Sequence, residues 1–197
     1  MIDERKVARW ITDAVVRQPL LWRLLRGRMR DMFDRIAPTW ETRLGPHHLG
    51  ALRLAVDGLA PLRILDVGTG TGVAALALAE WFPDAAVIGV DLSPGMVAEA
   101  ERKDGSVRFL VADASHLPFP DASFDLVVLM NAVPFFDELA RILVPGGAAA
   151  FSFSFGPETP IYVSEERLRE ELGRRGFTDV ETFSADPATA LRAVRKV

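Results

Sequence analysis

Short apolar, β-branched runs alternate with segments of helical pattern from Leu62 onward, and this alternation constrains the fold more than any other feature. In chain order the segments read LRILDV, GVAALALAEWF, AAVIGVD, PGMVAEAERK, VRFLVAD, FDLVVLMN, FDELARIL and GGAAAFSFSF. This alternation predicts a parallel sheet whose strands are joined by crossover helices. The strand runs are apolar almost throughout, as expected when helices cover both faces of the sheet.

The C-terminal part predicts one more helix and a strand pair. Ser164 can cap a helix over VSEERLREELGRRGF, and Gly176 suits its end. The segments FTDVETFSA and TALRAVRKV follow, separated by a break at DP that is too short for a crossover, so we expect them to pair antiparallel. The predicted fold is α/β: a doubly wound, mostly parallel, Rossmann-like sheet of seven strands, the last one antiparallel.

The N-terminal part differs from the rest in charge. The formal net charge is −4, but residues 1–35 contain nine Lys or Arg against five Asp or Glu, which leaves 14 against 22 for residues 36–197. We expect residues 1–50 to form a helical cap, or lid, over a core domain of residues 51–197. An acidic core repels phosphate backbones, so no nucleic-acid partner is expected.

Composition excludes several kinds of chemistry. The chain has no cysteine, which removes disulfides, thiolate zinc sites and cysteine nucleophiles. No apolar run approaches the roughly 18 residues of a membrane span, and the start MIDERK lacks the apolar region of a signal peptide. We therefore expect a cytoplasmic protein without a metal centre.

The turn after the first strand is unusually rich in glycine. ILDVGTGTG places Gly68, Gly70 and Gly72 between a strand and a helix, so a turn without side chains meets a helix N-terminus. Dinucleotides and S-adenosylmethionine both bind over turns of this kind. The third glycine comes one residue early for the dinucleotide pattern.

Polar side chains stand where four predicted strands end. Asp66, Asp91 and Asp113 end the first three, and Asn131 ends the fourth. The carboxyl ends of neighbouring parallel strands share one crevice, where these carboxylates would repel each other unless a ligand donates to them. S-adenosylmethionine offers an ammonium, a sulfonium, a ribose diol and an adenine amine. A nicotinamide cofactor has no general need for the carboxylate at the third strand.

From residue 31 to 197 the chain resembles class I S-adenosylmethionine-dependent methyltransferases, close to the small-molecule group of ubiquinone and menaquinone biosynthesis. The matching stretches are ILDVGTGTG, VIGVDLSPGMVAEAE, VRFLVADASHLPFPDASFDLVV and LARILVPGG, in the family's order and spacing. FDRIAPTWE is similar to a further family segment, Y-D-x-x-A-x-x-Y-D. Phe33 and Trp40 replace its tyrosines, and Phe33 lacks a hydroxyl that in the family can reach the cofactor carboxylate.

The resemblance implies S-adenosylmethionine as the cofactor and a role for each matching residue. Gly68, Thr69 and Gly70 would lie against the methionyl part, with Asp66 near its ammonium and Asp91 on the ribose. The adenine would lie between Leu92 and Met96 and against Asp113 and Ala114, and Asn131 would line the site.

Methyl transfer from a sulfonium is a direct displacement that needs alignment more than proton transfer, so a catalytic side chain is optional. His47 and His48 are candidate general bases; as adjacent histidines without cysteine they make a poor metal site. His116 is assigned no catalytic role. The segment MNAVPFF places Pro134, Phe135 and Phe136 where they could wall an apolar acceptor.

The segment VVRQPLLWRLLRGRMRDMF combines leucines with arginines, a composition typical of interfacial helices. We expect it to cover the site as part of the cap, with contact to a membrane surface as the second hypothesis.

The predicted function is methyl transfer to a small, apolar or aromatic acceptor. One alternative is an NAD(P)-dependent reductase, disfavoured because Tyr162 is the only tyrosine and no Tyr/Lys catalytic pair is evident. The other is a cofactor-binding module without turnover. Neither the acceptor, nor the atom methylated, nor the oligomeric state follows from the sequence.

Overall fold

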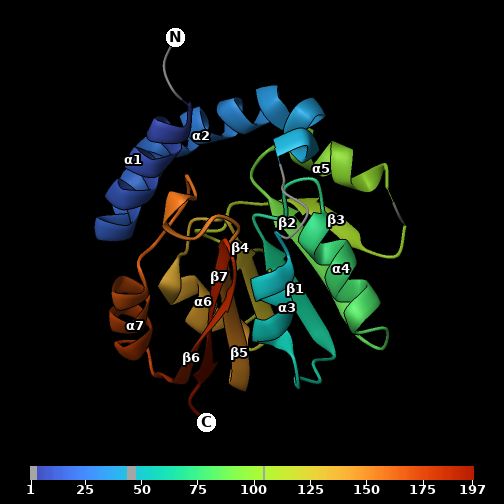
Figure 1. Cartoon of the computed structure of the whole chain (residues 1–197), viewed down its shortest axis with the longest axis vertical. Coiled ribbons are helices and arrows are strands. Elements are labelled where there is room, and N and C mark those ends of the chain that lie inside the picture. Colours follow the sequence, from blue (N-terminus) through green and yellow to red (C-terminus); the bar gives the residue numbers. More distant parts are fainter. Residues whose placement is uncertain (1–3, 44–47, 104) are drawn as a thin grey trace.

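The computed structural model describes residues 4–43, 48–103 and 105–197 (Figure 1). The N-terminal third consists of helices: α1 (Glu4–Arg17), η1 (Pro19–Leu21), α2 (Trp22–Ile36), η2 (Ala37–Arg43) and α3 (Gly50–Val56). Strands and helices then alternate: β1 (Arg63–Val67), α4 (Val73–Trp81), β2 (Ala86–Asp91), α5 (Pro94–Glu101), β3 (Arg108–Val111), β4 (Phe124–Met130), α6 (Phe136–Ile142) and β5 (Leu143–Phe153). The chain continues through η3 (Gly156–Glu158), α7 (Glu165–Gly173), β6 (Phe177–Ala185) and β7 (Ala188–Arg195).

The seven strands form one sheet in the order β3-β2-β1-β4-β5-β7-β6. Strand β7 is antiparallel to both of its neighbours, and the other pairs are parallel. The order reverses at β1, where Leu65 pairs with Ile88 of β2 on one side and with Val127 of β4 on the other. The predicted doubly wound sheet and the antiparallel last strand are confirmed, and the crevice of such a sheet lies at this reversal.

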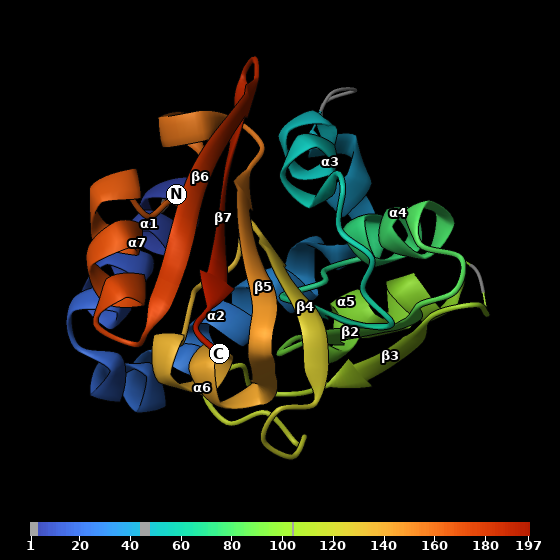
Figure 2. The same cartoon turned by 90° about the horizontal axis from the view of Figure 1, so that it is seen from below.

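Helices cover both faces of the sheet (Figure 2). One face packs against α3, α4 and α5 through residues such as Leu52 and Leu78, and the other packs against α6 and α7 through Leu139 and Leu168. All four side chains are at most 1% exposed. This two-sided burial explains why the strands are apolar along their whole length. The sequence pattern does not predict helix α3.

The helices α1 and α2 lie across one end of the sheet (Figure 1). They have an apolar cluster of their own, which includes Ile11, Trp22 and Met29 and packs on Phe135 and Ile161 of the core. The division into a cap of residues 1–50 and a core of residues 51–197 stays a prediction. No described helix is long and apolar enough to cross a membrane.

Candidate functional site

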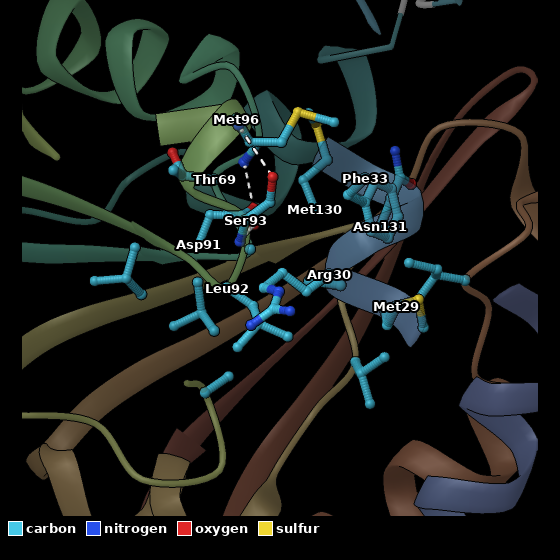
Figure 3. A pocket seen from close by; sticks show the side chains of 18 of the residues that line it. Met29, Arg30, Phe33, Thr69, Asp91, Leu92, Ser93, Met96, Met130 and Asn131 are labelled. Carbon is cyan, nitrogen blue, oxygen red and sulfur yellow. Dashed lines mark hydrogen bonds between the residues drawn. The ribbon is translucent and has the colours of Figure 1, made fainter. Parts of the chain in front are cut away.

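A cavity lies between the carboxyl ends of β1, β2 and β4 and the inner face of α2. In Figure 3, Met29 and Phe33 of α2 lie on one side, and Asp91, Leu92 and Met96 lie on the other. Its volume is about 90 Å³, whereas pockets for ligands of cofactor size hold about 300–1,000 Å³. In this structure the cavity is therefore narrower than a ligand of that size needs.

Eight of the predicted cofactor residues line this cavity: Gly68, Thr69, Gly70, Asp91, Leu92, Met96, Ala114 and Asn131. The other three, Asp66, Gly72 and Asp113, are not among its lining residues. Sequence reasoning missed Met29, Arg30 and Val133, which also line it.

The three glycines of the turn have different roles. All have positive φ angles, of 71°, 54° and 82° at Gly68, Gly70 and Gly72. A Cβ on Gly68 would lie 2.5 Å from the Ala132 side chain, and one on Gly72 would lie 2.7 Å from Phe109, so these two glycines allow close packing. At Gly70 the nearest atom is Trp40 Nε1, 3.4 Å away. Gly70 is therefore the glycine whose missing side chain leaves room next to the cap.

The amides of the turn are already used within the protein. The N–H groups of Gly68 and Thr69 donate to the carbonyl of Val90, at 2.8 and 2.9 Å. The Gly70 N–H donates to Asp91 Oδ2, at 2.8 Å. These three N–H groups are therefore not available to a ligand, and the turn offers it space instead.

Asp91 ends β2 and is held by two backbone amides. In addition to the bond from Gly70, its Oδ1 accepts a hydrogen bond from the Ser93 N–H at 2.8 Å. Burial raises the pKa of Asp91, and these two bonds partly offset the rise. Each carboxylate oxygen keeps a lone pair for a further donor such as a ribose hydroxyl.

Asp66 is fully buried in β1, beneath the turn. Its Oδ2 accepts a hydrogen bond from the Thr69 hydroxyl at 2.7 Å, and the backbone N–H of Ala75 at the start of α4 also stabilises the carboxylate. Burial raises the pKa of Asp66 to about 7, with the Thr69 bond opposing and the charge of Asp91 adding to the rise. A buried carboxylate is costly unless donors or a cation stabilise its charge, and here the two donors offset the burial only in part.

Asp113 faces the cap instead of the cavity. Its Oδ1 accepts from the indole N–H of Trp22 at 2.7 Å and from the Ser115 N–H and hydroxyl, while its Oδ2 pairs with Arg26 at 2.8 Å. Burial alone would raise the pKa of Asp113, but the bonds from Ser115, Arg26 and Trp22 hold it below its ordinary value. In this structure the expected adenine acceptor is occupied by α2.

A second contact joins the cap to the cofactor side of the site, and sequence reasoning missed it. Asp34 of α2 accepts hydrogen bonds from the Ser93 hydroxyl and from the Gly95 N–H, the latter at 2.9 Å. Ser93 also caps α5 by accepting from the Met96 N–H at 3.1 Å. The loop after β2 is therefore fixed from both sides.

Asn131 follows β4 with a φ of 55° and is anchored to the end of β5. Its side-chain amide donates to the Ser154 hydroxyl at 2.8 Å and accepts from the Ser154 N–H at 2.9 Å. Close by, Phe33 and Trp40 meet edge to face at 5.6 Å between ring centroids. These three side chains also line a second cavity, beside the first.

The candidate bases gain no support from the geometry. His47 lies outside the described residues, and His48 is not among the described residues that line either cavity. Of the three residues expected to wall the acceptor, Phe135 lines the first cavity and not the second, and Pro134 is not among the described residues that line either. Phe136 lines neither cavity: it is buried in the core and packs on Phe151, with ring centroids 6.3 Å apart.

The residues present fit S-adenosylmethionine in chemistry. The space over Gly70 could take the methionyl part, and the buried carboxyl of Asp66 lies beneath the turn next to it. Asp91 stands at the end of the neighbouring strand with acceptors for a diol, and Leu92 and Met96 give an apolar surface for a flat ring.

Comparisons with known proteins also indicate a methyltransferase. The family model of a methyltransferase domain matches residues 64–147. A demethylmenaquinone methyltransferase from Roseiflexus castenholzii is 33% identical over 180 residues, which cover 81% of this chain and 76% of that protein. A malonyl-acyl-carrier-protein O-methyltransferase from Geobacter sulfurreducens is 35% identical over 166 residues, covering 68% of this chain and 62% of that protein. The chain likewise spans less than two thirds of the length of several other curated relatives that it matches.

A solved structure shares the fold. It is the complex of the Haloferax volcanii Trm112 methyltransferase activator with a methyltransferase, and the likeness has a TM-score of 0.68 at 23% identity, covering 84% of this chain and 98% of that one.

The similarity to the Roseiflexus protein, over most of both chains, identifies the family. The chain belongs to the class I S-adenosylmethionine-dependent methyltransferases, the family that its four ordered motifs resemble.

Proposed function

We propose that the chain transfers a methyl group from S-adenosylmethionine to a small acceptor with an apolar or aromatic body. When bound, the cofactor supplies a methyl group on a positively charged sulfur. The protein's own residues bind both molecules, align them and exclude water. Of the cofactor contacts proposed, Asp91 would hold the ribose, Gly68, Thr69 and Gly70 the methionyl part, and Leu92, Met96 and Ala114 the adenine.

The second cavity is the observation that carries the acceptor proposal. It holds about 360 Å³, enough for a small organic molecule, and most of its lining is apolar. It lies between the cap and the segment after β5. Its lining residues are Glu4, Arg5, Ala8, Met32, Phe33, Ile36, Trp40, Asn131, Phe155, Thr159, Pro160 and Ile161.

A wall shared by the two cavities supports the proposal that the acceptor binds next to the cofactor. Four residues line both cavities, so the two share a wall: Phe33, Trp40, Asn131 and Ile161. Alignment at near-attack distance can supply roughly 7–11 kcal/mol of the barrier without any proton transfer. A dry, aromatic wall also keeps water from competing for the methyl group.

One lining residue favours a second class of acceptor. Arg5 could pair with a carboxylate, so an acceptor that bears an acid group, as the name of the Geobacter relative indicates for that protein, is the second candidate. The apolar majority of the lining favours a neutral ring system, which agrees with the name of the Roseiflexus relative.

The earlier alternatives have less support. Tyr162 packs against Phe153, with ring centroids 4.9 Å apart, and beneath the Arg9 guanidinium, and it is not among the described lining residues of the cofactor cavity. A reductase mechanism through this tyrosine therefore has no structural basis here. A binding module without turnover is separated from an enzyme by the assay below.

The test uses two methionines three residues apart on α2, each 4% exposed. Met32 lines the second cavity and Met29 lines the first. Transfer from radiolabelled S-adenosylmethionine is measured with a soluble hydroquinone and with a malonyl thioester, and S-adenosylhomocysteine binding is measured by calorimetry. Met32→Gln is expected to lower turnover by about tenfold or more with unchanged cofactor affinity, because it places an amide in the acceptor cavity.

Met29→Gln is the matched control, for which we expect weaker S-adenosylhomocysteine binding. The acceptor proposal is wrong if Met32→Gln leaves the turnover of both acceptors intact. Turnover of the malonyl thioester alone, lost in Arg5→Gln, would select the acid-bearing class instead. No transfer to either acceptor by a chain that binds S-adenosylhomocysteine favours the binding module.

A further inference from the structure

The turn between α1 and α2 carries an exposed stripe of leucine and arginine on its outer side. Leu20 and Leu24 are each 80% exposed, a high value for leucine, and Arg28 continues the stripe one helical turn later. Arg17 and Arg23 are exposed beside it. We call these five residues the arginine–leucine stripe.

The charge of this region is one-sided. Residues 14–30 contain five arginines and no acidic residue, whereas residues 36–197 carry 14 basic against 22 acidic residues. Arg26 is paired with Asp113 and Arg30 with Asp31. Within the part of the chain that the structure describes, none of the three arginines of the stripe forms an ion pair. The stripe is therefore a local positive surface on an acidic protein.

The shape of this region distinguishes a membrane from a protein partner. The turn lies at the edge of the molecule, away from the sheet (Figure 2). Its leucines project from η1 and the start of α2, and they do not line the main cavities of the described residues. Protein interfaces usually centre on such anchored side chains. A fluid lipid surface needs only protruding apolar groups flanked by cations.

We propose that the arginine–leucine stripe docks the protein on anionic lipid bilayers. Leu20 and Leu24 enter the boundary between headgroups and acyl chains, and Arg17, Arg23 and Arg28 bind lipid phosphates. Arginine suits this position because its aliphatic stem can lie along apolar surface while the guanidinium stays at the headgroups.

The inner side of the same helix belongs to the cofactor site, since Trp22, Met29 and Phe33 line its cavity. Docking therefore places the cap between the lipid and the site. The proposal concerns the outer side alone and does not depend on the identity of the methyl acceptor.

The experiment is co-sedimentation of the full chain with vesicles of phosphatidylcholine alone or with added phosphatidylglycerol. We expect binding only to the anionic vesicles, weakening as salt is added. Replacing Arg17, Arg23 and Arg28 together by Gln is expected to weaken it on the order of 100-fold. Leu20→Ser with Leu24→Ser is expected to weaken it about tenfold or more, because apolar insertion contributes in addition to charge.

Two control variants match these changes elsewhere on the surface. Leu54→Ser with Leu62→Ser removes two leucines that are 47% and 63% exposed, and replacing Arg108, Arg169 and Arg174 by Gln removes the same charge. Both controls are expected to bind vesicles like the original chain, and S-adenosylhomocysteine calorimetry on every variant reports folding and the cofactor site separately.

The proposal is overturned if the chain ignores anionic vesicles, or if the stripe and control variants bind equally. It is also overturned if light scattering shows a dimer that the leucine changes dissociate, because the stripe would then be an interface between copies of the chain.

Discussion

The indole N–H of Trp22 donates a hydrogen bond of 2.7 Å to Asp113, which lies 91 positions later in the chain. The same carboxylate accepts from Arg26 and twice from Ser115. It is also the group that the family resemblance assigns to the adenine. On that assignment, we expect the cap and the adenine to compete for this carboxylate, next to a cofactor cavity of about 90 Å³.

Removing one of these cap contacts is expected to ease cofactor entry. In Arg26→Ala the ion pair with Asp113 is lost, and Arg26 is half exposed, so the effect is modest. We expect S-adenosylhomocysteine to associate faster and bind up to about fivefold tighter, the range of an exposed ion pair. Stopped-flow fluorescence of the site tryptophans measures both rates.

Arg23→Ala removes an exposed arginine of α2 that does not contact Asp113 and serves as the control. Slower association or weaker binding in Arg26→Ala would mean that Arg26 holds the bound cofactor instead of opposing its entry.

Gly70→Val is expected to abolish S-adenosylhomocysteine binding. A side chain at this position would meet Trp40, 3.4 Å from the new Cβ, and would fill the space that the methionyl part needs. The φ of 54° adds backbone strain of about 1–2 kcal/mol.

Gly58→Val separates the two effects, because Gly58 has a φ of 73° with nothing within 4 Å of a new Cβ. Calorimetry is expected to show normal affinity in Gly58→Val and none in Gly70→Val, at a similar loss of thermal stability. Equal affinities in the two variants would refute the role of Gly70.

Asp66 predicts a specific dependence of stability on pH. Its pKa is about 7 in the folded protein and about 3.9 in an unfolded chain. Between these values the folded state keeps a proton that the unfolded state has lost, so this group's contribution falls as pH rises from about 4 to about 7 and is constant above. Asp66→Asn cannot titrate and can still accept the Thr69 bond.

Relative to the original chain, Asp66→Asn is therefore expected to gain stability with rising pH, on the order of 4 kcal/mol between pH 4 and 8. Urea unfolding of both chains across this range measures the difference. A difference that does not change with pH would show that Asp66 is ionised in the folded protein.

The division of the chain predicts the result of truncation. Deleting residues 1–30 removes most of the cap's apolar cluster but leaves the sheet and its covering helices, α3 included. We expect a folded core that binds S-adenosylhomocysteine within about tenfold, or 1.4 kcal/mol, of the full chain, and that has lost turnover. A core that does not fold would show that the cap belongs to the main domain, and full turnover would show that the cap does not enclose the site.

The sequence predicts the fold well because its signals are local. Apolar strand runs, glycine turns and short connections each follow from a few neighbouring residues, as the break at DP before the antiparallel β7 shows. The helix over Gly50–Val56 lacks such a signal: its cap residue, Leu49, makes no capping bond, and only packing on the sheet distinguishes it from the preceding cap.

The site is predicted less completely because its contacts are distant in sequence. Strand-end spacing places Asp91 correctly, but it does not reveal that Asp113 meets Trp22 and Arg26 of the cap. The glycine pattern does not show which glycines serve packing, since Ala132 and Phe109 come from other strands and loops. The sequence gives no reason to distinguish Phe136 from its neighbour Phe135, yet the direction of α6 buries Phe136 in the core.

The central claim is that the crevice at Asp91 binds S-adenosylmethionine through the ribose. Calorimetry of S-adenosylhomocysteine with the original chain and with Asp91→Ala tests this claim most directly. We predict saturable binding to the original chain that weakens by about 1.5–3 kcal/mol in the variant, the value of hydrogen bonds to a charged group. Unchanged affinity in a folded Asp91→Ala protein, or no binding to the original chain, would contradict it.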